Sequence, residues 1–224
     1  MKPFGEKAIQ FYSDLDFRER LPADVEIMNP YRVPGVMDVV SAFFNKFYSD
    51  DHERVMILGI NPGRFGAGVT GITFTDPVRL AEDCGIPNPF EKRAELSSRF
   101  VYEVIQASGG PEVFFSRFFL SAVSPLGFTS SGKNLNYYDK PFLETALQGF
   151  INSTLKKQAS LGIRRDAVIC LGEGRNFRYL QKLNTGLGLF RRIYPLPHPR
   201  WVMQYRYREK EDFNRDYRQL LGKI

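Results

Sequence analysis

Four short apolar runs along the chain predict buried strands. They lie at 54–60 (RVMILGI), 114–123 (FFSRFFLSAV), 166–171 (DAVICL) and 189–196 (LFRRIYPL), and Gly, Pro or polar residues bound each of them. Short continuous apolar runs of this kind are typical of strands that are buried on both faces of a parallel sheet.

Apolar positions spaced three or four residues apart predict helices between and after these strands. The helical patterns lie at 37–48, 96–107, 143–155 and 213–221. Gly109 and Gly110 end the second pattern, and Asp139 and Pro141 are start signals for the third. Alternating helices and strands predict a parallel sheet covered on both faces, in which ligands bind beyond the carboxyl ends of the strands.

The composition fits one folded α/β domain over residues 1–224, because 43% of the residues are hydrophobic. No apolar run approaches the roughly 20 residues that span a bilayer, and the first residues contain no signal-peptide core. We therefore expect no membrane partner and a cytoplasmic protein, at the nucleoid of a bacterium. The two cysteines, Cys84 and Cys170, are expected to be packed free thiols.

Positive charge is concentrated in one segment of the chain. The net charge is +6, yet the segment from Gly174 to Arg208 contains no Asp or Glu. Its basic residues are Arg175, Arg178, Lys182, Arg191, Arg192, Arg200, Arg206 and Arg208. Such an asymmetry indicates a polyanionic partner, with nucleic acid the first candidate, although a basic solubilising surface would give the same pattern.

The first predicted strand ends in GINPGRFGAG, a glycine-rich loop. No Lys-Ser/Thr pair follows it, as a P-loop requires, and it lacks the spacing of a dinucleotide-binding GxGxxG turn. Asn61 lies at the tip of the strand, and Pro62 stiffens the turn. The glycines would let the backbone approach a ligand closely.

The fourth predicted strand ends in YPLPHPRW, where prolines flank His198. His198 is one of two histidines in the chain, and its place at a strand end within the acid-free segment makes it a catalytic candidate. Nucleophile-elbow, HExxH and paired-cysteine metal motifs are absent from the sequence. The chemical inventory is then one asparagine, one histidine and a basic rim.

These motifs resemble the uracil-DNA glycosylase superfamily, most of all its single-strand-selective monofunctional (SMUG) branch. GINPGRFGAGVTGITF is similar to the first motif of that branch, GMNPGPFGMAQTGVPF. The later stretches SPLGF…SGKNL, CLGEGRNF and HPRW are similar, in the same order, to the family's CPL…SGRNL, VGxGRF and HPSPRN. The resemblance covers residues 54–205, and its departures indicate a divergent bacterial subgroup.

The resemblance implies a three-layer α/β/α sandwich around a four-stranded parallel sheet. It also implies hydrolysis of the N-glycosidic bond to a damaged base in single- or double-stranded DNA, without metal or cofactor, by a monomer that flips the base out of the stack. Asn61 would position the attacking water, and His198 would donate a hydrogen bond to the departing base.

The same resemblance assigns the remaining contacts. Phe74 would stack on the flipped base, with core packing as its alternative role, and the further residues expected to bind the base are Ile60, Gly63, Ser124, Asn134 and Asn136. Gly63 stands where strict uracil enzymes place a Tyr, so that larger bases would fit. The residues expected to bind DNA are Lys133, Arg175, Arg200, Trp201 and Arg206, although for Trp201 a core role is equally consistent with the sequence.

One departure affects specificity. Ala122 occupies the position of the family's base-reading Asn, and an alanine side chain makes no hydrogen bond to uracil. The residues that could replace the missing contact are Ser121, Ser124, Asn134 and Asn136. We therefore expect relaxed specificity, with xanthine and hypoxanthine excised beside uracil. The HPRW stretch is also shorter than the family motif, which leaves the wedge residues open.

Two other classes of protein share parts of this pattern. A DNA-binding protein that lost its chemistry would need neither Asn61 nor His198, so their joint presence favours an enzyme. A hydrolase of small nucleotides would have little need of the acid-free segment.

Overall fold

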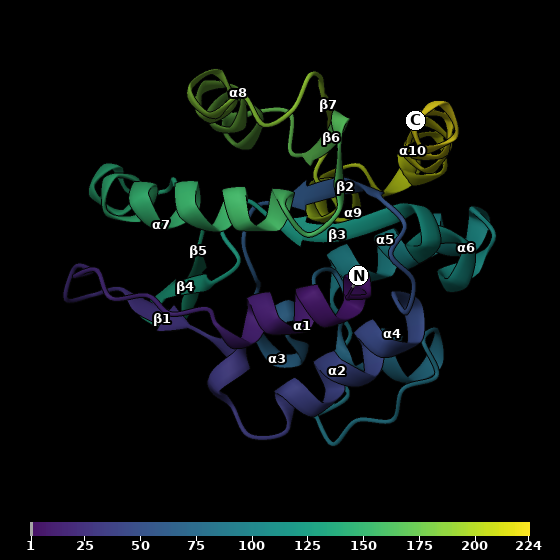
Figure 1. Cartoon of the computed structure of the whole chain (residues 1–224), viewed down its shortest axis with the longest axis horizontal. Helices are drawn as coiled ribbons and strands as arrows, with labels where there is room; N and C mark the ends of the chain where they lie inside the picture. Colours follow the sequence, from purple (N-terminus) through teal and green to yellow (C-terminus); the bar gives the residue numbers. More distant parts are fainter. Residues whose placement is uncertain (1) are drawn as a thin grey trace.

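The central feature of the computed structural model, which describes residues 2–224, is a four-stranded parallel sheet (Figure 1). Its strands are β2 (Arg54–Gly59), β3 (Phe118–Ala122), β6 (Ile163–Leu171) and β7 (Ile193–Leu196), in the order β3-β2-β6-β7. All three neighbouring pairs are parallel. The predicted sheet is confirmed, and each of its four strands falls within or overlaps one of the predicted apolar runs.

Two of the predicted strands are shorter than expected. Residues 114–117 belong to helix α6 (Gly110–Arg117), which has Gly109 at its N-cap and Pro111 in its first turn. A short apolar run can be buried as a helix or as a strand, and periodicity alone does not distinguish the two. Here the Gly-Gly-Pro sequence favours a helix start, so the first half of the run is helical. Residues 189–192 likewise precede β7 as irregular chain.

Helices cover both faces of the sheet. Alternate residues of a strand point to opposite faces, and β2 and β3 are buried along their whole length, so both faces have to be covered. On one face Phe119 packs against Phe4, and Ser121 is bonded to Tyr12 and Gln158. This face meets α1 (Phe4–Ser13), α2 (Val36–Phe47), α7 (Pro141–Ala159) and α8 (Arg175–Leu187). The other face, which contains Leu120, meets α5 (Leu96–Ala107), α6 and α10 (Lys210–Lys223). The three-layer sandwich expected from the resemblance is thereby confirmed.

Short elements frame the carboxyl ends of the strands. The small antiparallel sheet β1-β4-β5 is made of β1 (Glu26–Met28), β4 (Gly127–Ser130) and β5 (Lys133–Leu135). The remaining elements are the helices α3 (Ala67–Thr70), α4 (Pro77–Glu82) and α9 (Pro199–Tyr205), and the 3-10 turns η1 (Pro30–Arg32) and η2 (Tyr207–Glu209). Helix α7 begins at Pro141 with Lys140 at its N-cap, whereas the carboxylate of Asp139, the expected start signal, accepts hydrogen bonds from Asn136.

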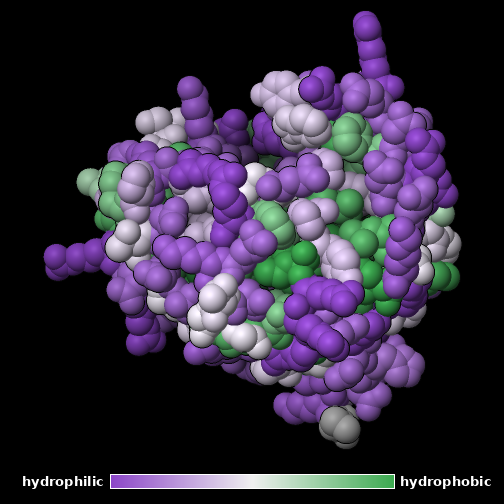
Figure 2. Space-filling model, turned by 90° about the horizontal axis from the view of Figure 1, so that it is seen from above, coloured by the Kyte–Doolittle hydropathy of each residue, from purple (hydrophilic) through white to green (hydrophobic). Residues whose placement is uncertain are grey.

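The surface above α8, β7 and α10 is mostly hydrophilic, with apolar side chains gathered near its middle (Figure 2). Among residues 2–224, no helix has both the length and the apolar character needed to cross a membrane. Both cysteines are buried and free, as expected.

Candidate active site

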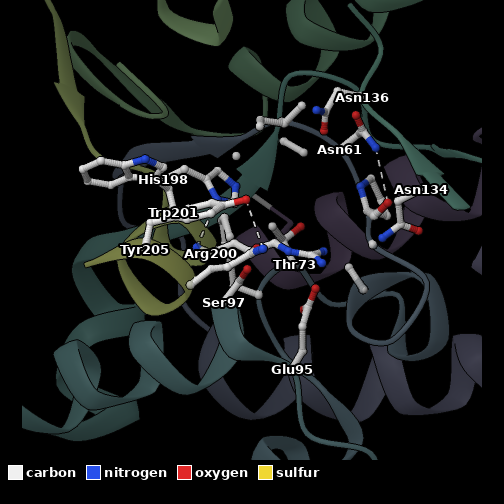
Figure 3. Close-up of a pocket in the computed structure, with 18 residues that line it drawn as sticks. Asn61, Thr73, Glu95, Ser97, Asn134, Asn136, His198, Arg200, Trp201 and Tyr205 are labelled. Carbon is white, nitrogen blue, oxygen red and sulfur yellow. Dashed lines mark hydrogen bonds between the residues drawn. The ribbon is translucent and has the colours of Figure 1, made fainter. Parts of the chain in front are cut away.

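A cavity of about 290 Å³ opens at the carboxyl ends of the parallel strands (Figure 3). It brings together the loop after β2, the end of β3, the residues after β5, and the start of α9 after β7. The predicted residues that line it are Ile60, Asn61, Gly63, Phe74, Asn134, Asn136, His198, Arg200 and Trp201. Segments far apart in the sequence therefore converge on one site.

The Asn61 side chain is held at the tip of β2 by backbone groups of its own loop, of the end of β5 and of the loop after β5. Its amide nitrogen donates to the carbonyl oxygens of Leu135 (3.1 Å) and Pro62 (3.3 Å). Its oxygen accepts from the Tyr137 N–H at 3.0 Å. The amide is thus fixed in one orientation, and its carbonyl oxygen keeps a second lone pair that can orient a water molecule.

A second layer of contacts holds this loop in place. The Tyr137 hydroxyl donates to the Asn176 side-chain oxygen at 2.8 Å. The amide nitrogen of Asn176, which is buried at the start of α8, donates in turn to the Leu171 carbonyl at 3.0 Å. The end of β6 is therefore tied through two buried side chains to the loop that orients Asn61.

Phe74 lies in the cavity wall with an unusual backbone. Its φ of 56° is in the left-handed region, which non-glycine residues adopt rarely and mostly where the surroundings impose it. The Thr70 hydroxyl supports this turn by donating to the Thr75 carbonyl at 2.6 Å. A Cβ on Gly59 would lie 2.8 Å from the Phe74 ring, so glycine at the strand end lets the ring lie flush against β2. Most of the Phe74 side chain is buried, and its remaining side lines the cavity.

His198 is the N-cap residue of α9, and its partly buried ring points into the cavity (Figure 3). Its Nδ1 accepts a hydrogen bond from the Arg200 N–H at 3.2 Å. Burial, together with the positive charge of Arg200, lowers the pKa of His198 to about 4. The ring is therefore neutral at physiological pH, with its proton on Nε2, where it can be donated to a ligand.

Helix α9 presents aromatic and basic side chains at the mouth of the cavity. Trp201 is 40% exposed and contacts Phe213 only edge-on, with ring centroids 5.9 Å apart, so it is not a core residue. The Arg206 guanidinium lies 5.4 Å from the centre of the Trp201 ring. Tyr205, which the sequence analysis did not single out, lines the same rim and is 65% exposed.

Three predicted residues lie outside the lining of the cavity, on the exposed surface. Lys133 is exposed on β5, beside the hairpin turn at Ser131 and Gly132. Arg175 is exposed at the start of α8, where it stacks on Tyr138 at 4.9 Å. Arg206 follows α9.

Of the four residues that could replace the family's base-reading Asn, the structure places two in the lining of the cavity. Ala122 lines the cavity, as expected from its place at the end of β3. Ser124, however, is fully buried and donates to the Leu126 carbonyl at 2.9 Å, outside the cavity lining, so the expectation that it binds the base is wrong. Ser121 lies on the opposite face of β3, bonded to Gln158. Asn134 and Asn136 line the cavity and are therefore the two candidates to contact the base.

An acidic residue that the sequence analysis missed also lines the cavity. Glu95 precedes α5 and reaches the glycine-rich loop, where an oxygen of its carboxyl lies 2.9 Å from the position of a Cβ on Gly63. The carboxyl of Glu95 therefore lies beside Gly63, where the sequence predicted room for a larger base. No motif marks Glu95, because only the folded loop brings it to the strand end. Among residues 2–224, no group of three or more His, Cys, Asp or Glu side chains is arranged to hold a metal ion.

Comparison with known proteins matches the chain to a protein family and to solved structures. The family model described as the uracil DNA glycosylase superfamily matches residues 46–222. The crystal structure of wild-type SMUG2 from Pedobacter heparinus is similar over 99% of this chain and 98% of that chain, with 44% sequence identity and a TM-score of 0.97.

Proposed function

Because the chain belongs to the uracil DNA glycosylase superfamily and is a DNA glycosylase, we propose that it excises uracil, xanthine and hypoxanthine from DNA. The observation that carries this proposal is the pairing, in one cavity, of a fixed Asn61 amide with a neutral His198. The relaxed specificity is supported by Ala122, whose methyl group makes no hydrogen bond to a base.

The chemistry separates charge between sugar and base. As the bond between C1′ and the base breaks, the sugar becomes positive and the base negative. The second lone pair of the Asn61 oxygen would hold a water molecule below C1′, and placement suffices because the ionising sugar is a strong electrophile. The Nε2–H of His198 would donate to the base atom that gathers negative charge, a role that requires the neutral ring.

We infer that the target nucleotide is flipped into the cavity, because the reacting groups lie inside it and cannot reach a stacked base. Trp201 and Tyr205 at its mouth would fill the vacated stack, since exposed aromatic side chains can replace stacking. Arg200 and Arg206 on the same helix, with Lys133 and Arg175 further out, would neutralise phosphates.

The proposal is tested by incubating the protein with labelled oligonucleotides that carry uracil, xanthine or hypoxanthine, followed by alkaline cleavage of abasic sites. We expect cleavage for all three bases. We expect His198→Ala to lower the excision rate about 10²–10³-fold, as loss of a preorganised donor does. Asn61→Ala should lower it about 10²-fold through loss of water placement.

Arg215→Ala on the exposed part of α10 is the matched control and should keep the wild-type rate. Undiminished cleavage by the His198 and Asn61 variants would contradict the assigned roles. Cleavage of uracil alone would contradict the relaxed specificity.

A further inference from the structure

Glu95 is the one acidic side chain that lines the cavity within the described chain. Its Oε1 lies 2.9 Å from the position of a Cβ on Gly63, and its Oε2 lies 2.1 Å from that of a Cβ on Gly66. The carboxyl thus occupies the space that two side chains of the glycine-rich loop would fill. Substituting either glycine would displace it.

The Glu95 backbone is anchored, whereas its carboxyl accepts a single hydrogen bond within the described chain. The Glu95 N–H donates to the buried Asp76 carboxylate at 2.8 Å. Ser98 donates to Oε2 at 3.3 Å, and among residues 2–224 no hydrogen bond to Oε1 is formed. Glu95 is the N-cap residue of α5, yet its side chain makes no capping hydrogen bond. The fold therefore uses one oxygen of the carboxyl and leaves Oε1 free to meet a ligand.

The charges around Glu95 leave it without an ion pair in the described chain. The positive charge of Arg200, on α9, lowers the pKa of the Glu95 carboxyl, but no salt bridge joins the two side chains. The carboxylate of Asp76 has the opposite effect on this pKa. Arg64 on the glycine-rich loop is turned toward the carbonyl of Gly132. Burial outweighs these influences and raises the pKa of the Glu95 carboxyl. In its protonated form the carboxyl donates a hydrogen bond as well as accepting one.

The position of Glu95 relative to the other groups suggests which base atom it meets. Asn61 marks the sugar end of the base, while His198 and Glu95 project into the cavity from different sides (Figure 3). A purine whose N3 side faces His198 presents its N7 to the glycine-rich loop. In uracil the corresponding edge carries only C–H groups, which accept no hydrogen bond.

Resting on the proposed excision of deaminated purines, we propose that Glu95 is a catalytic residue specific to them, and that its carboxyl donates its proton to N7 of xanthine or hypoxanthine. In this step the bond from C1′ to N9 breaks, and its electron pair passes into the base. The proton of Glu95 then neutralises the base at N7. Water adds to C1′ and releases a proton to solvent, from which Glu95 is reprotonated.

The test compares wild-type, Glu95→Leu and Glu95→Gln proteins in single-turnover excision of uracil and hypoxanthine. General acids typically contribute about 10²–10⁴-fold to a rate. We therefore expect Glu95→Leu to lower the ratio of the hypoxanthine rate to the uracil rate about 100-fold. Glu95→Gln keeps an N–H donor but no transferable proton, so the same ratio should fall less.

The pH profile separates this role from a merely structural one. Wild-type excision of hypoxanthine should slow as the pH rises and Glu95 ionises, relative to excision of uracil by the same sample. In Glu95→Gln this difference between the two profiles should vanish. Glu91→Gln in the exposed loop before Glu95 is the matched control and should behave as wild type.

Equal slowing of both bases in Glu95→Leu, or unchanged ratios in both variants, would overturn the assignment while leaving the proposed function intact. A wild-type protein that excises uracil but no purine would overturn both. The isosteric Glu95→Gln variant, with its thermal unfolding midpoint measured, guards against a loss of folding in Glu95→Leu.

Discussion

At the scale of single residues, His198 shows how the fold selects one protonation state. The Arg200 N–H occupies Nδ1, and burial disfavours the charged ring, so that the pKa of His198 falls to about 4. An imidazole in the unfolded chain titrates near 6.5. The same arrangement that supplies a neutral hydrogen-bond donor therefore makes the stability of the folded protein depend on pH.

Between about pH 4 and pH 6.5 the unfolded chain binds a proton at His198 that the folded protein does not bind. The free energy of unfolding should therefore fall as the pH falls through this window, and be independent of this group above it. We expect this component to disappear in His198→Gln. Urea unfolding of both proteins from pH 4.5 to 7.5 measures it as the difference between their curves. A constant difference across the range would contradict the lowered pKa.

At the scale of elements, the orientation of the Asn61 amide, which we propose positions the attacking water, depends on the loop between β5 and α7. Tyr137 supplies the backbone N–H that Asn61 accepts, and the Tyr137 hydroxyl is fixed by Asn176 at the start of α8. Tyr137→Phe removes the hydrogen bond to Asn176. The backbone N–H that donates to Asn61 then loses the support of this bond. Since small misplacements of a reacting group are costly, we expect kcat to fall about tenfold with KM little changed.

Single-turnover and steady-state excision of uracil by Tyr137→Phe measure this effect. The matched control is Tyr138→Phe, on the neighbouring residue, whose hydroxyl forms no hydrogen bond within residues 2–224. An unchanged kcat, or a rise in KM alone, would show that the Asn176–Tyr137 contact does not position Asn61.

The elements that could be predicted from the sequence are those whose burial is carried by a local pattern. The runs at 54–60 and 166–171 have no charged residue after their first position, and they lie almost entirely within β2 and β6. The run at 114–123 mixes two states, because Phe114 and Phe115 are buried on α6 and Phe118 is buried on β3. The strands β1, β4 and β5 are only three or four residues long, and no local pattern marks them.

At the scale of the whole molecule, the cavity is assembled from strand ends that the sequence separates widely. Asn61, Phe74 and His198 could be predicted because recognisable motifs carry them. Glu95 could not be predicted, because it lies beside Gly63 and Gly66 only in the folded chain. There its N–H donates to Asp76, which fixes the start of α5. The misplacement of Ser124 has a similar origin, since one turn after β3 buries its hydroxyl against Leu126.

We propose that a deaminated base leaves the DNA stack and enters this cavity. The most direct measurement is a crystal structure of Asn61→Ala bound to a duplex with one hypoxanthine, because this variant should bind the base but cleave it slowly. We predict the base against Phe74, with His198 Nε2 and Glu95 at opposite edges. A hypoxanthine still stacked in the duplex, with α9 outside the DNA, would contradict the proposed entry of the base into the cavity.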